Sequence, residues 1–506
     1  MSALFQDVFQ YRSRQRSLRF VLQVAVRMLY PDDVLRIRYD LPRGYYCELC
    51  RPVSDPHRPA EVKHIKMADI LAIKQKMKEL KESDLPIHSE LLSKEEAAGL
   101  FLSQNQPDKA ELIRSLRAEK CQVYSLCGVR DTLHGPLLPS TGGIGVFDIN
   151  AFADGFCLRY EAFVGTGLLP NHSQGKIAAA LRHHSRWCED LGINGVGSLN
   201  RVLQEDGGTA LVNLCEARHE RMFAAIADEI FARRDCLRIV FIAGPSSSGK
   251  TSTSLRLAQQ CRIAGLTPKV IELDNYFVSR EETPRDENGE YDFESLGAMR
   301  LDLLGEQLES LLAGEEVNIP RFDFAQGKGL FEGHYLHLDE DDILIMEGIH
   351  ALNPEMVPGI DSSRIFRVYA SALTSLNVDE NVCISTSDNR LLRRIVRDNR
   401  VRSTNPEQTI LRWPSVRRGE NKNIFPFQEN ADAYFNSALI YELPLLKVYA
   451  EPLLRQIPQD SPAWPEAQRL LSFLSYIVPL PARDIAAIPP TSILREFIGG
   501  QTLQRI

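Results

Sequence analysis

The distribution of hydrophobic positions divides the chain into stretches with helical spacing and short runs that are apolar on both faces. Apolar residues recur at helical spacing over Leu18–Leu29, and an alternating stretch typical of a strand begins at Val34–Arg38. Two more helical patterns fall within residues 66–120, where Ser93, followed by two glutamates, is typical of a helix N-cap. These patterns predict an α+β domain, which we place at residues 1–165.

Residues 166–234 are expected to form a helical connector. Its first part is predicted as a glycine-rich loop with two adjacent histidines, and its second part, Leu211–Arg234, as a helix with one apolar face. Residues 235–442 then form the main domain. Residues 443–506 show helical spacing broken by prolines, which predicts a helical C-terminal extension that caps that domain, with Gly499 and Gly500 ending the last helix.

The run Leu237–Ser254, LRIVFIAGPSSSGKTSTS, changes from a buried strand pattern to a glycine-bounded loop. Its spacing fits G-x-x-x-x-G-K-[ST], in which backbone N–H groups and a helix N-terminus surround a polyphosphate. The alternative is a serine-rich turn that matches by accident. We therefore predict nucleotide binding by Gly244, Pro245, Ser246, Ser247, Ser248, Gly249, Lys250, Thr251 and Ser252, with Lys250 on the phosphates and the Thr251 hydroxyl on Mg²⁺.

Two further apolar strands end in acidic residues. Lys269–Leu273 is followed by Asp274, and Asp341–Gly348 contains Glu347 after four apolar positions. Ligands of doubly wound sheets lie at the C-terminal ends of strands, so Asp274 is placed to accept a proton from an acceptor hydroxyl. A helix N-cap is the alternative for Asp274. Glu347 occupies the position expected of a Mg²⁺ ligand.

Arginines are dense after Asp388. Four of them lie at i, i+3, i+4 and i+7, on one face of a predicted helix. Planar forked donors suit a transferring phosphoryl group, so we interpret this face as a lid over the nucleotide. A solvated face and an RNA-binding surface stay open as alternatives. The four residues are Arg390, Arg393, Arg394 and Arg397.

Composition narrows the class of protein. The 506 residues, 44% of them hydrophobic, are enough for two to four domains, and a net charge of -8 argues against a general affinity for nucleic acid or anionic membrane. The chain shows neither an apolar run of membrane-spanning length nor a signal peptide, so we expect a cytoplasmic protein. The ten cysteines are expected to be reduced, with Cys47 and Cys50 as packing residues.

These motifs resemble the uridine kinase and phosphoribulokinase group of P-loop kinases, and more narrowly bacterial nucleoside kinases fused to a synthetase-like region. The matching segments are GPSSSGKTS, LDNYF, YDFESLGA, EGIHALNP, RRIVRDNRVR and VRRGENKNIFPFQENADAYFNSAL. The resemblance implies ATP-dependent phosphorylation of a nucleoside 5′-hydroxyl, with Asp274 as base. It also implies that Thr251, Glu347 and Asp274 lie around Mg²⁺ and that Glu294 holds the ribose. Arg394, Arg397 and Arg402 are implied to lie in the lid, the first two as catalytic residues and Arg402 as a cofactor-binding residue.

The departures from that group concern recognition of the base. Uridine kinases read the pyrimidine with a tyrosine and a histidine near P-x-Y-D-F, where this chain has Phe322 and Gly327, and Phe277 replaces another tyrosine. A pocket with fewer hydrogen-bonding groups discriminates weakly between bases. The resemblance therefore supports phosphoryl transfer more strongly than pyrimidine specificity.

Arg16–Asp32 and Val123–Phe147 resemble the second additional, editing-type domain of threonyl-tRNA synthetases. In that family two histidines of one motif and a cysteine and a histidine of another form the editing site. The corresponding positions here are Arg16, Phe20, Leu133 and Leu137. Neither metal binding nor editing is therefore implied for this chain.

Together these observations predict a multidomain chain: an α+β N-terminal domain, then an α/β P-loop domain with a parallel sheet and a helical C-terminal extension. The favoured function is an ATP- and Mg²⁺-dependent nucleoside kinase, uridine or cytidine favoured. A kinase of another small alcohol, such as a sugar phosphate, and an RNA-binding regulatory NTPase are the alternatives. The expected partner is a small-molecule nucleoside, and we expect no association with a membrane. Contact with tRNA through the N-terminal domain and formation of a homo-oligomer are left open.

Overall fold

The computed structural model describes residues 3–41, 43–51, 61–116, 118–161, 167–168, 174–205, 207–285, 289, 291–323 and 326–504, without the side chains of residues 3–8. The chain forms two compact units that interleave in sequence. Unit 1 comprises residues 1–208, 374–389 and 443–481, and unit 2 comprises residues 209–373, 390–442 and 482–506.

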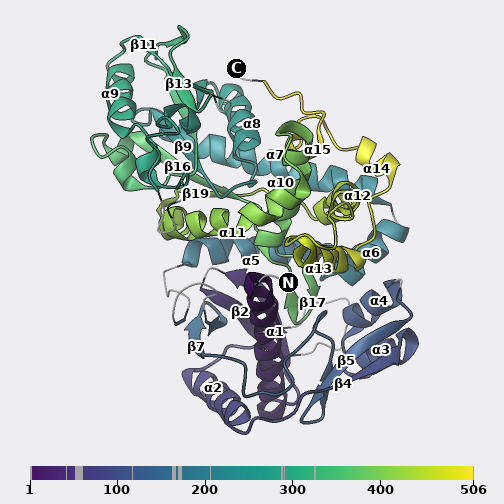
Figure 1. The fold of residues 1–506 in the computed structure, drawn as a ribbon. Coiled ribbons are helices and arrows are strands. Elements are labelled where there is room, and N and C mark those ends of the chain that lie inside the picture. Colours follow the sequence, from purple (N-terminus) through teal and green to yellow (C-terminus); the bar gives the residue numbers. More distant parts are fainter. Residues whose placement is uncertain are drawn as a thin grey trace. The chain divides into compact units, whose positions relative to one another are not determined.

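Unit 1 contains an antiparallel sheet with the strand order β1-β2-β8-β7 and a short β3 paired to β2. Two of these strands, β2 and β7, are labelled in Figure 1. Along β1 the expected alternation is confirmed, since Leu35 and Ile37 are buried while Arg36 and Arg38 lie on the other face. A second, three-stranded sheet has the order β4-β5-β6. The strands are β1 (Val34–Leu41), β2 (Gly44–Arg51), β3 (Glu61–Val62), β4 (His88–Ser93), β5 (Lys120–Leu126), β6 (Val129–Asp131), β7 (Phe147–Phe152) and β8 (Gly155–Tyr160).

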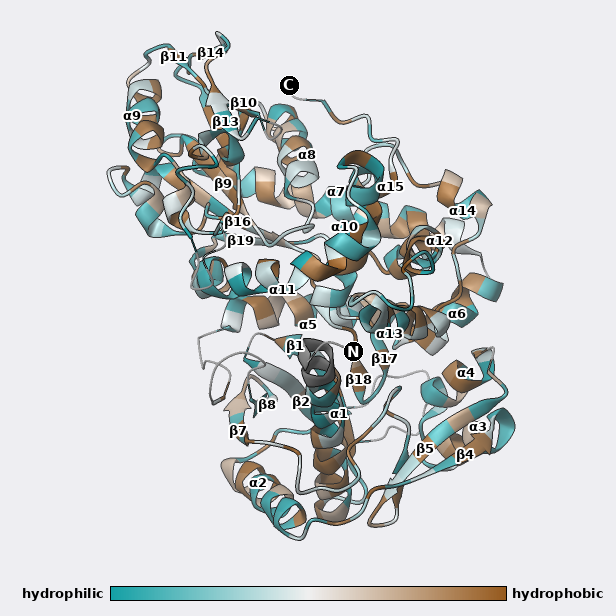
Figure 2. Cartoon of the chain, in the orientation of Figure 1, coloured by the Kyte–Doolittle hydropathy of each residue, from teal (hydrophilic) through white to brown (hydrophobic). Residues whose placement is uncertain are grey.

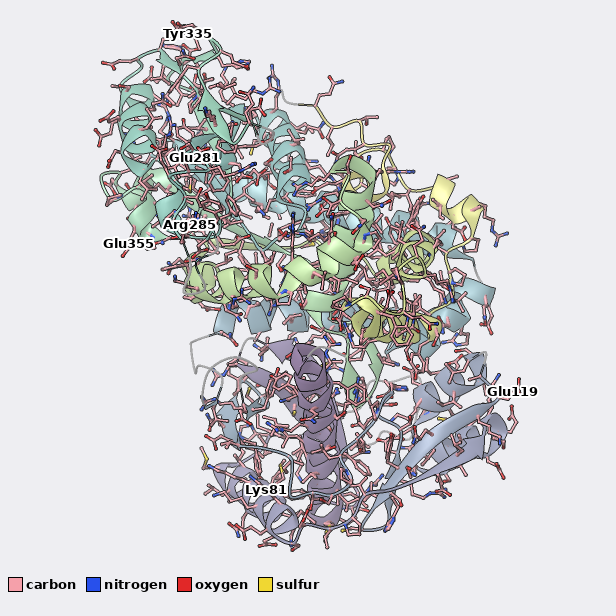
Figure 3. The ribbon with its side chains drawn as sticks, in the orientation of Figure 1. Lys81, Glu119, Glu281, Arg285, Tyr335 and Glu355 are labelled. Atoms are coloured by element: carbon pink, nitrogen blue, oxygen red, sulfur yellow. The ribbon has the colours of Figure 1, made fainter. Side chains whose placement is uncertain are left out.

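The helices of unit 1 begin and end at recognisable signals. The predicted N-cap is confirmed, since the Ser93 hydroxyl accepts from the Glu96 N–H at 3.3 Å. Lys81, labelled in Figure 3, lies at the end of α2. It donates to the Gly145 carbonyl at 2.7 Å and so holds the loop before β7. The helices in residues 3–205 are α1 (Ala3–Leu29), α2 (Met67–Glu82), α3 (Lys94–Ser103), α4 (Pro107–Ser115), α5 (Gly175–Asp190) and α6 (Val196–Glu205).

The loop expected in the first part of the connector is wrong over residues 175–205, where the structure has α5 and α6. On α5 the buried positions Ile177, Leu181, His184 and Cys188 follow helical spacing. The helical spacing is hard to recognise in the sequence because one of the buried positions is a polar residue, His184. Its Nδ1 lies 2.5 Å from the Ser375 hydroxyl.

A buried polar cluster explains why residues 374–389 belong to unit 1. Lys109 of α4 lies 2.5 Å from Asp131 and 3.6 Å from Asp379, and all three side chains are fully buried. His134 Nε2 lies 2.6 Å from the same Asp379 carboxylate. Asp379 ends β17 (Asn377–Asp379), which pairs with β18 (Val382–Cys383). Burial of a charged lysine without a carboxylate partner would lower the stability of the fold by several kcal/mol. The carboxylates of Asp131 and Asp379 are therefore needed beside Lys109.

Unit 2 is built on a parallel five-stranded sheet with the order β10-β15-β9-β16-β19. Every residue of β9 and β15 is buried, and the hydrophobic colouring of β9 is visible in Figure 2. Such double burial is the reason that these strands read as continuous apolar runs. The strands are β9 (Ile239–Ala243), β10 (Thr267–Glu272), β15 (Asp342–Glu347), β16 (Ile365–Ser371) and β19 (Ala433–Asn436).

Helices and small hairpins complete unit 2. One two-stranded sheet pairs β11 (Val317–Asn318) with β14 (Tyr335–Leu336), and the hairpin of β12 (Arg321–Asp323) and β13 (Lys328–Leu330) lies between these two strands in the sequence. The helices are α7 (Gly208–Ala232), α8 (Lys250–Ile263), α9 (Leu301–Leu312), α10 (Thr386–Val401), which begins in unit 1, and α11 (Pro406–Asn423). Single turns of 3₁₀ helix are η1 (Leu273–Tyr276), η2 (Leu296–Ala298), η3 (Pro354–Met356), η4 (Ser362–Arg364) and the longer η5 (Phe425–Asn430).

The C-terminal region divides between the units. The helices α12 (Glu442–Leu454) and α13 (Trp464–Ser475) lie in the part assigned to unit 1, apart from Glu442. The helices α14 (Ala482–Ala486) and α15 (Leu494–Ile498) belong to unit 2. Gly499, with φ of 98°, ends α15 as expected. In the described part of the chain, helices of the length and apolarity that crossing a membrane requires are absent.

Candidate functional site

The loop between β9 and α8 is held in a shape that needs its two glycines. A Cβ on Gly244 would lie 1.9 Å from the Ala370 carbonyl oxygen. Gly249 has φ of 84°, and a Cβ there would lie 2.7 Å from Ile493. Ser247 also has positive φ, 59°. The motif glycines are therefore required by close backbone packing and by left-handed conformation.

Three consecutive carbonyl oxygens of this loop accept hydrogen bonds from buried side chains outside it. Arg390 donates to Ser246 O at 3.0 Å and Arg393 to Ser247 O at 3.4 Å. The Ser437 hydroxyl donates to Ser248 O at 2.6 Å. We call Arg390, Arg393 and Ser437 the loop brace. The peptide bonds of this loop are trans, so each carbonyl points opposite to the N–H group of the next residue. By binding the three carbonyl oxygens, the loop brace therefore directs the N–H groups of Ser247, Ser248 and Gly249 away from itself.

Buried acids hold the two arginines of the brace. Arg390 pairs with Glu420, which also accepts from the Ser246 N–H at 3.0 Å. Arg393 pairs with Glu442 and donates to Ser437 O at 2.8 Å. All four charged side chains are at most 1% exposed. The hypothesis that the whole arginine face forms a lid is therefore wrong for Arg390 and Arg393, because both lie in the interior of unit 2.

Arg394, Arg397 and Arg402 share one carboxylate. Arg394 donates to the Ser246 hydroxyl at 2.8 Å and to Asp398 at 3.2 Å, and Arg397 donates to Asp398 at 2.8 Å. Arg402 lies 3.7 Å from the same carboxylate. Burial lowers the pKa of Arg394 and of Arg402, but both remain cationic near neutral pH. The structure thus brings these predicted residues together beside the loop, around an acid that the sequence analysis did not single out.

Oxygen-bearing side chains gather at the C-terminal ends of β9, β10 and β15. The Thr251 hydroxyl donates to Glu347 Oε1 at 2.7 Å. Asp274 lies in η1, directly after β10, within electrostatic range of Lys250, Glu347 and Arg402. In the described residues no group of three or more His, Cys, Asp or Glu side chains has the arrangement of a metal site.

Burial controls the charge of these carboxyls. It raises the pKa of Glu347 to about 7, while Lys250 opposes the shift and Asp274 adds to it. It also raises the pKa of Asp274, against the effect of Lys250 and with that of Glu272. The pKa of Glu294 likewise rises to about 7, through burial and the nearby Glu420. A cation or a phosphate-bound metal among them would favour the ionised forms.

Two of the predicted substrate-binding residues form an aromatic pair, and one of the two lies close to Asp274 in the sequence. The Phe277 and Phe322 rings meet edge to face, with centroids 5.8 Å apart. Gly327 has φ of 68°, a conformation that disfavours the histidine found in uridine kinases. Glu294 lies against α11, where a Cβ on Gly419 would come within 2.4 Å of its Cβ. Glu294 lies within electrostatic range of Lys250 and Asp274.

In unit 1 two of the four positions that correspond to the synthetase motif are occupied by buried packing residues. Phe20 and Leu133 are buried, and a Cβ on Gly135 would lie 2.6 Å from the Arg16 guanidinium carbon. Cys47 and Cys50 are free thiols inside β2, and burial raises the pKa of Cys50 to about 11. These thiols lie in the core of unit 1, as predicted for packing residues.

Comparison with known proteins gives two different similarities. Residues 239–441 match the model of the Phosphoribulokinase / Uridine kinase family. The uridine kinase of Schizosaccharomyces pombe (strain 972 / ATCC 24843) is 33% identical over 156 residues, which are 30% of this chain and 32% of that kinase. The structure of a possible uridine kinase from Bacillus stearothermophilus aligns at 25% identity and a TM-score of 0.26, over 30% of this chain and 80% of that chain.

The other similarity concerns the N-terminal region. The threonine–tRNA ligase of Burkholderia multivorans (strain ATCC 17616 / 249) is 32% identical over 143 residues, 28% of this chain. The chain spans 21% of that ligase's length. Residues 239–441 thus form a domain of the phosphoribulokinase and uridine kinase family, in a chain whose N-terminal region is similar to threonine–tRNA ligases.

Proposed function

We propose that this protein is a kinase that transfers the γ-phosphoryl group of ATP to the 5′-hydroxyl of a nucleoside, uridine or cytidine favoured. The observation that carries the proposal is the meeting of the braced loop with Lys250, Asp274 and the Thr251–Glu347 pair at one edge of the unit 2 sheet. A base, a phosphate-binding lysine and oxygen ligands at that edge are the groups that phosphoryl transfer requires.

The loop residues fit a polyphosphate. The Ser247 and Ser248 hydroxyls are buried, and the described residues offer neither a hydrogen-bond partner. Buried polar atoms are normally satisfied, so unsatisfied hydroxyls in a loop of N–H donors favour an anionic ligand. We assign Gly244 to Ser252 to the phosphates, and Arg394, Arg397 and Arg402 to the transferring phosphoryl group and the nucleotide.

Thr251, Glu347 and Asp274 fit Mg²⁺. Mg²⁺ prefers hard oxygen ligands and usually takes only one or two from the protein, with waters and phosphate oxygens completing its octahedron. When bound, Mg²⁺ would neutralise charge on the phosphates. Asp274 would accept the proton of the acceptor hydroxyl, and Lys250 would hold the phosphates in line with that oxygen.

The acceptor is assigned from the remaining residues. Glu294 would accept hydrogen bonds from the ribose hydroxyls, and the Phe277 and Phe322 rings would cover the base. Since the family that residues 239–441 match also includes phosphoribulokinases, a sugar phosphate is the second candidate acceptor.

The direct test is product analysis by chromatography and mass detection after incubation with Mg²⁺·ATP and a panel of nucleosides, deoxynucleosides and sugar phosphates. We expect a 5′-monophosphate from a ribonucleoside. A bisphosphate formed from a sugar phosphate would favour the second candidate. ADP without a phosphorylated acceptor would contradict both and favour an RNA-binding regulatory NTPase, to be examined by tRNA binding.

The raised pKa values predict an acid limb in the pH profile. Because Glu347 has a pKa of about 7 and must be ionised to hold a metal, kcat/KM for Mg²⁺·ATP should fall about fivefold from pH 7 to pH 6, as one ionisation near pH 7 requires. The decrease of kcat at acid pH should occur at a lower pH than that of kcat/KM, because bound Mg²⁺·ATP favours the ionised form of Glu347. Steady-state rates in buffers of constant ionic strength provide the measurement, and a flat kcat/KM between pH 5 and 7 would contradict the assignment.

A further inference from the structure

Unit 1 contains a polar cavity of about 310 Å³. Its walls are the Arg36 and Arg38 face of β1, Glu48 of β2, and Arg182, Arg186 and Glu189 of α5. We call it the arginine cavity. Arg182, Arg186 and Glu189 lie at i, i+4 and i+7, so they share one face of α5, while the opposite face is buried. Arg16, Phe20, Leu133 and Leu137, the positions of the synthetase editing motif, are not among its lining residues.

Some of the charges in the arginine cavity are already satisfied. Arg38 donates to the Ser185 hydroxyl and to Glu189, both at 2.5 Å, and lies 3.4 Å from Glu48. Arg182 donates to Asp154 at 3.0 Å. The three carboxylates of the lining are therefore each engaged by an arginine.

The guanidinium groups of Arg36 and Arg186 keep N–H donors that a ligand could use. The nearest described carboxylate oxygen to Arg36 belongs to Glu189, at 3.8 Å, which is beyond hydrogen-bonding distance. For Arg186 the described residues provide neither a hydrogen bond nor an ion pair. His64 adds a ring nitrogen to the same lining. Four arginines against three carboxylates leave one net positive charge in the lining.

We propose that the arginine cavity binds a phosphate monoester that carries hydroxyl groups, such as a sugar phosphate. Forked guanidinium donors match the oxygens of a single phosphate group. The net charge suits one such group, and the carboxylates on the same wall disfavour a second phosphate while accepting hydrogen bonds from hydroxyls. The volume is that of a small-molecule site and exceeds the need of a bare phosphate ion.

Isothermal titration calorimetry of the full chain with ribose 5-phosphate tests this proposal, with inorganic phosphate as the second titrant. We expect ribose 5-phosphate to bind more tightly than phosphate, and the double variant Arg36→Gln/Arg186→Gln to weaken it at least tenfold. Lys78→Gln, which removes an exposed charge elsewhere in unit 1, should bind as the wild type does. Lys250→Ala should also keep this binding, since Lys250 belongs to the phosphate loop.

Each other outcome overturns the proposal. Equal affinity for ribose 5-phosphate and inorganic phosphate would mean that only the anion is held. Unchanged binding by the double variant would place the ligand elsewhere, and loss of binding in Lys250→Ala alone would place it at the phosphate loop. The first two results leave the nucleoside kinase proposal untouched. The third would favour a sugar phosphate as the kinase acceptor, which the product analysis decides separately.

Discussion

Replacement of Asp274 by asparagine is expected to lower kcat for phosphoryl transfer by about 10²- to 10⁴-fold, the range that a positioned general base contributes. The amide keeps the size of the side chain but cannot take the proton. Because burial and Glu272 raise the pKa of Asp274, loss of its charge should not destabilise unit 2. The affinity for Mg²⁺·ATP should change little, since the loop brace, Lys250, Thr251 and Glu347 remain and the asparagine amide keeps one oxygen that Mg²⁺ can use.

The measurement is a single-turnover assay for the phosphorylated acceptor together with a titration of a non-hydrolysable ATP analogue. Asp302→Asn is the matched control, because Asp302 is an exposed acid on α9 of the same unit. A variant at Asp274 that retained close to the full rate would refute its assignment as the base. A variant that lost ATP affinity as well would show that its main role is in nucleotide binding.

The second large effect is expected at the loop brace. Arg393→Met leaves the Glu442 carboxylate buried without its cation and should lower the free energy of unfolding by about 3–5 kcal/mol. The double variant Arg393→Met/Glu442→Gln removes the orphaned charge and should recover most of that loss. It also keeps an acceptor for the Leu439 N–H, which Glu442 satisfies at 3.2 Å.

The double variant separates positioning from stability. Without Arg393 the Ser247 carbonyl is no longer held, so the following N–H can turn away from the phosphates. We expect the Kd for the ATP analogue to rise about tenfold in the double variant, the equivalent of one hydrogen bond. Urea denaturation and calorimetric titration give the two quantities. If the double variant recovered the stability and also bound the ATP analogue with wild-type affinity, Arg393 would have only a structural role and would not position the phosphate loop.

The sequence predicted the parts of the site that depend on local order. Strand, loop and helix at residues 237–263, and the acids after β10 and within β15, follow from apolar runs and fixed spacings, and the structure brings them together as expected. The brace could not be predicted in this way. Its acids, Glu420 and Glu442, lie 30 and 49 residues from their arginines, and nothing in the spacing of α10 shows which arginines they will take.

The same limit explains the other differences. Arg390 and Arg394 occupy one face of the predicted helix, yet one is buried beside Trp413 and the other contacts the Ser246 hydroxyl. Helical periodicity predicts the face of the helix on which a side chain lies, but it does not predict which charged group that side chain will contact. Only the first part of the helical connector was predicted as a loop, because glycines flank α5, although the buried positions of α5 follow a helical period.

The interleaving of the two units has a consequence for synthesis of the chain. The polypeptide passes from one unit to the other at 208/209, 373/374, 389/390, 442/443 and 481/482. The carboxylate of Asp379, which the buried Lys109 requires, is translated about 270 residues after that lysine. Unit 1 can therefore be completed only after residue 481 has left the ribosome, when nearly all of unit 2 has been made. No single cut releases either unit intact, so the two halves of this protein must mature together.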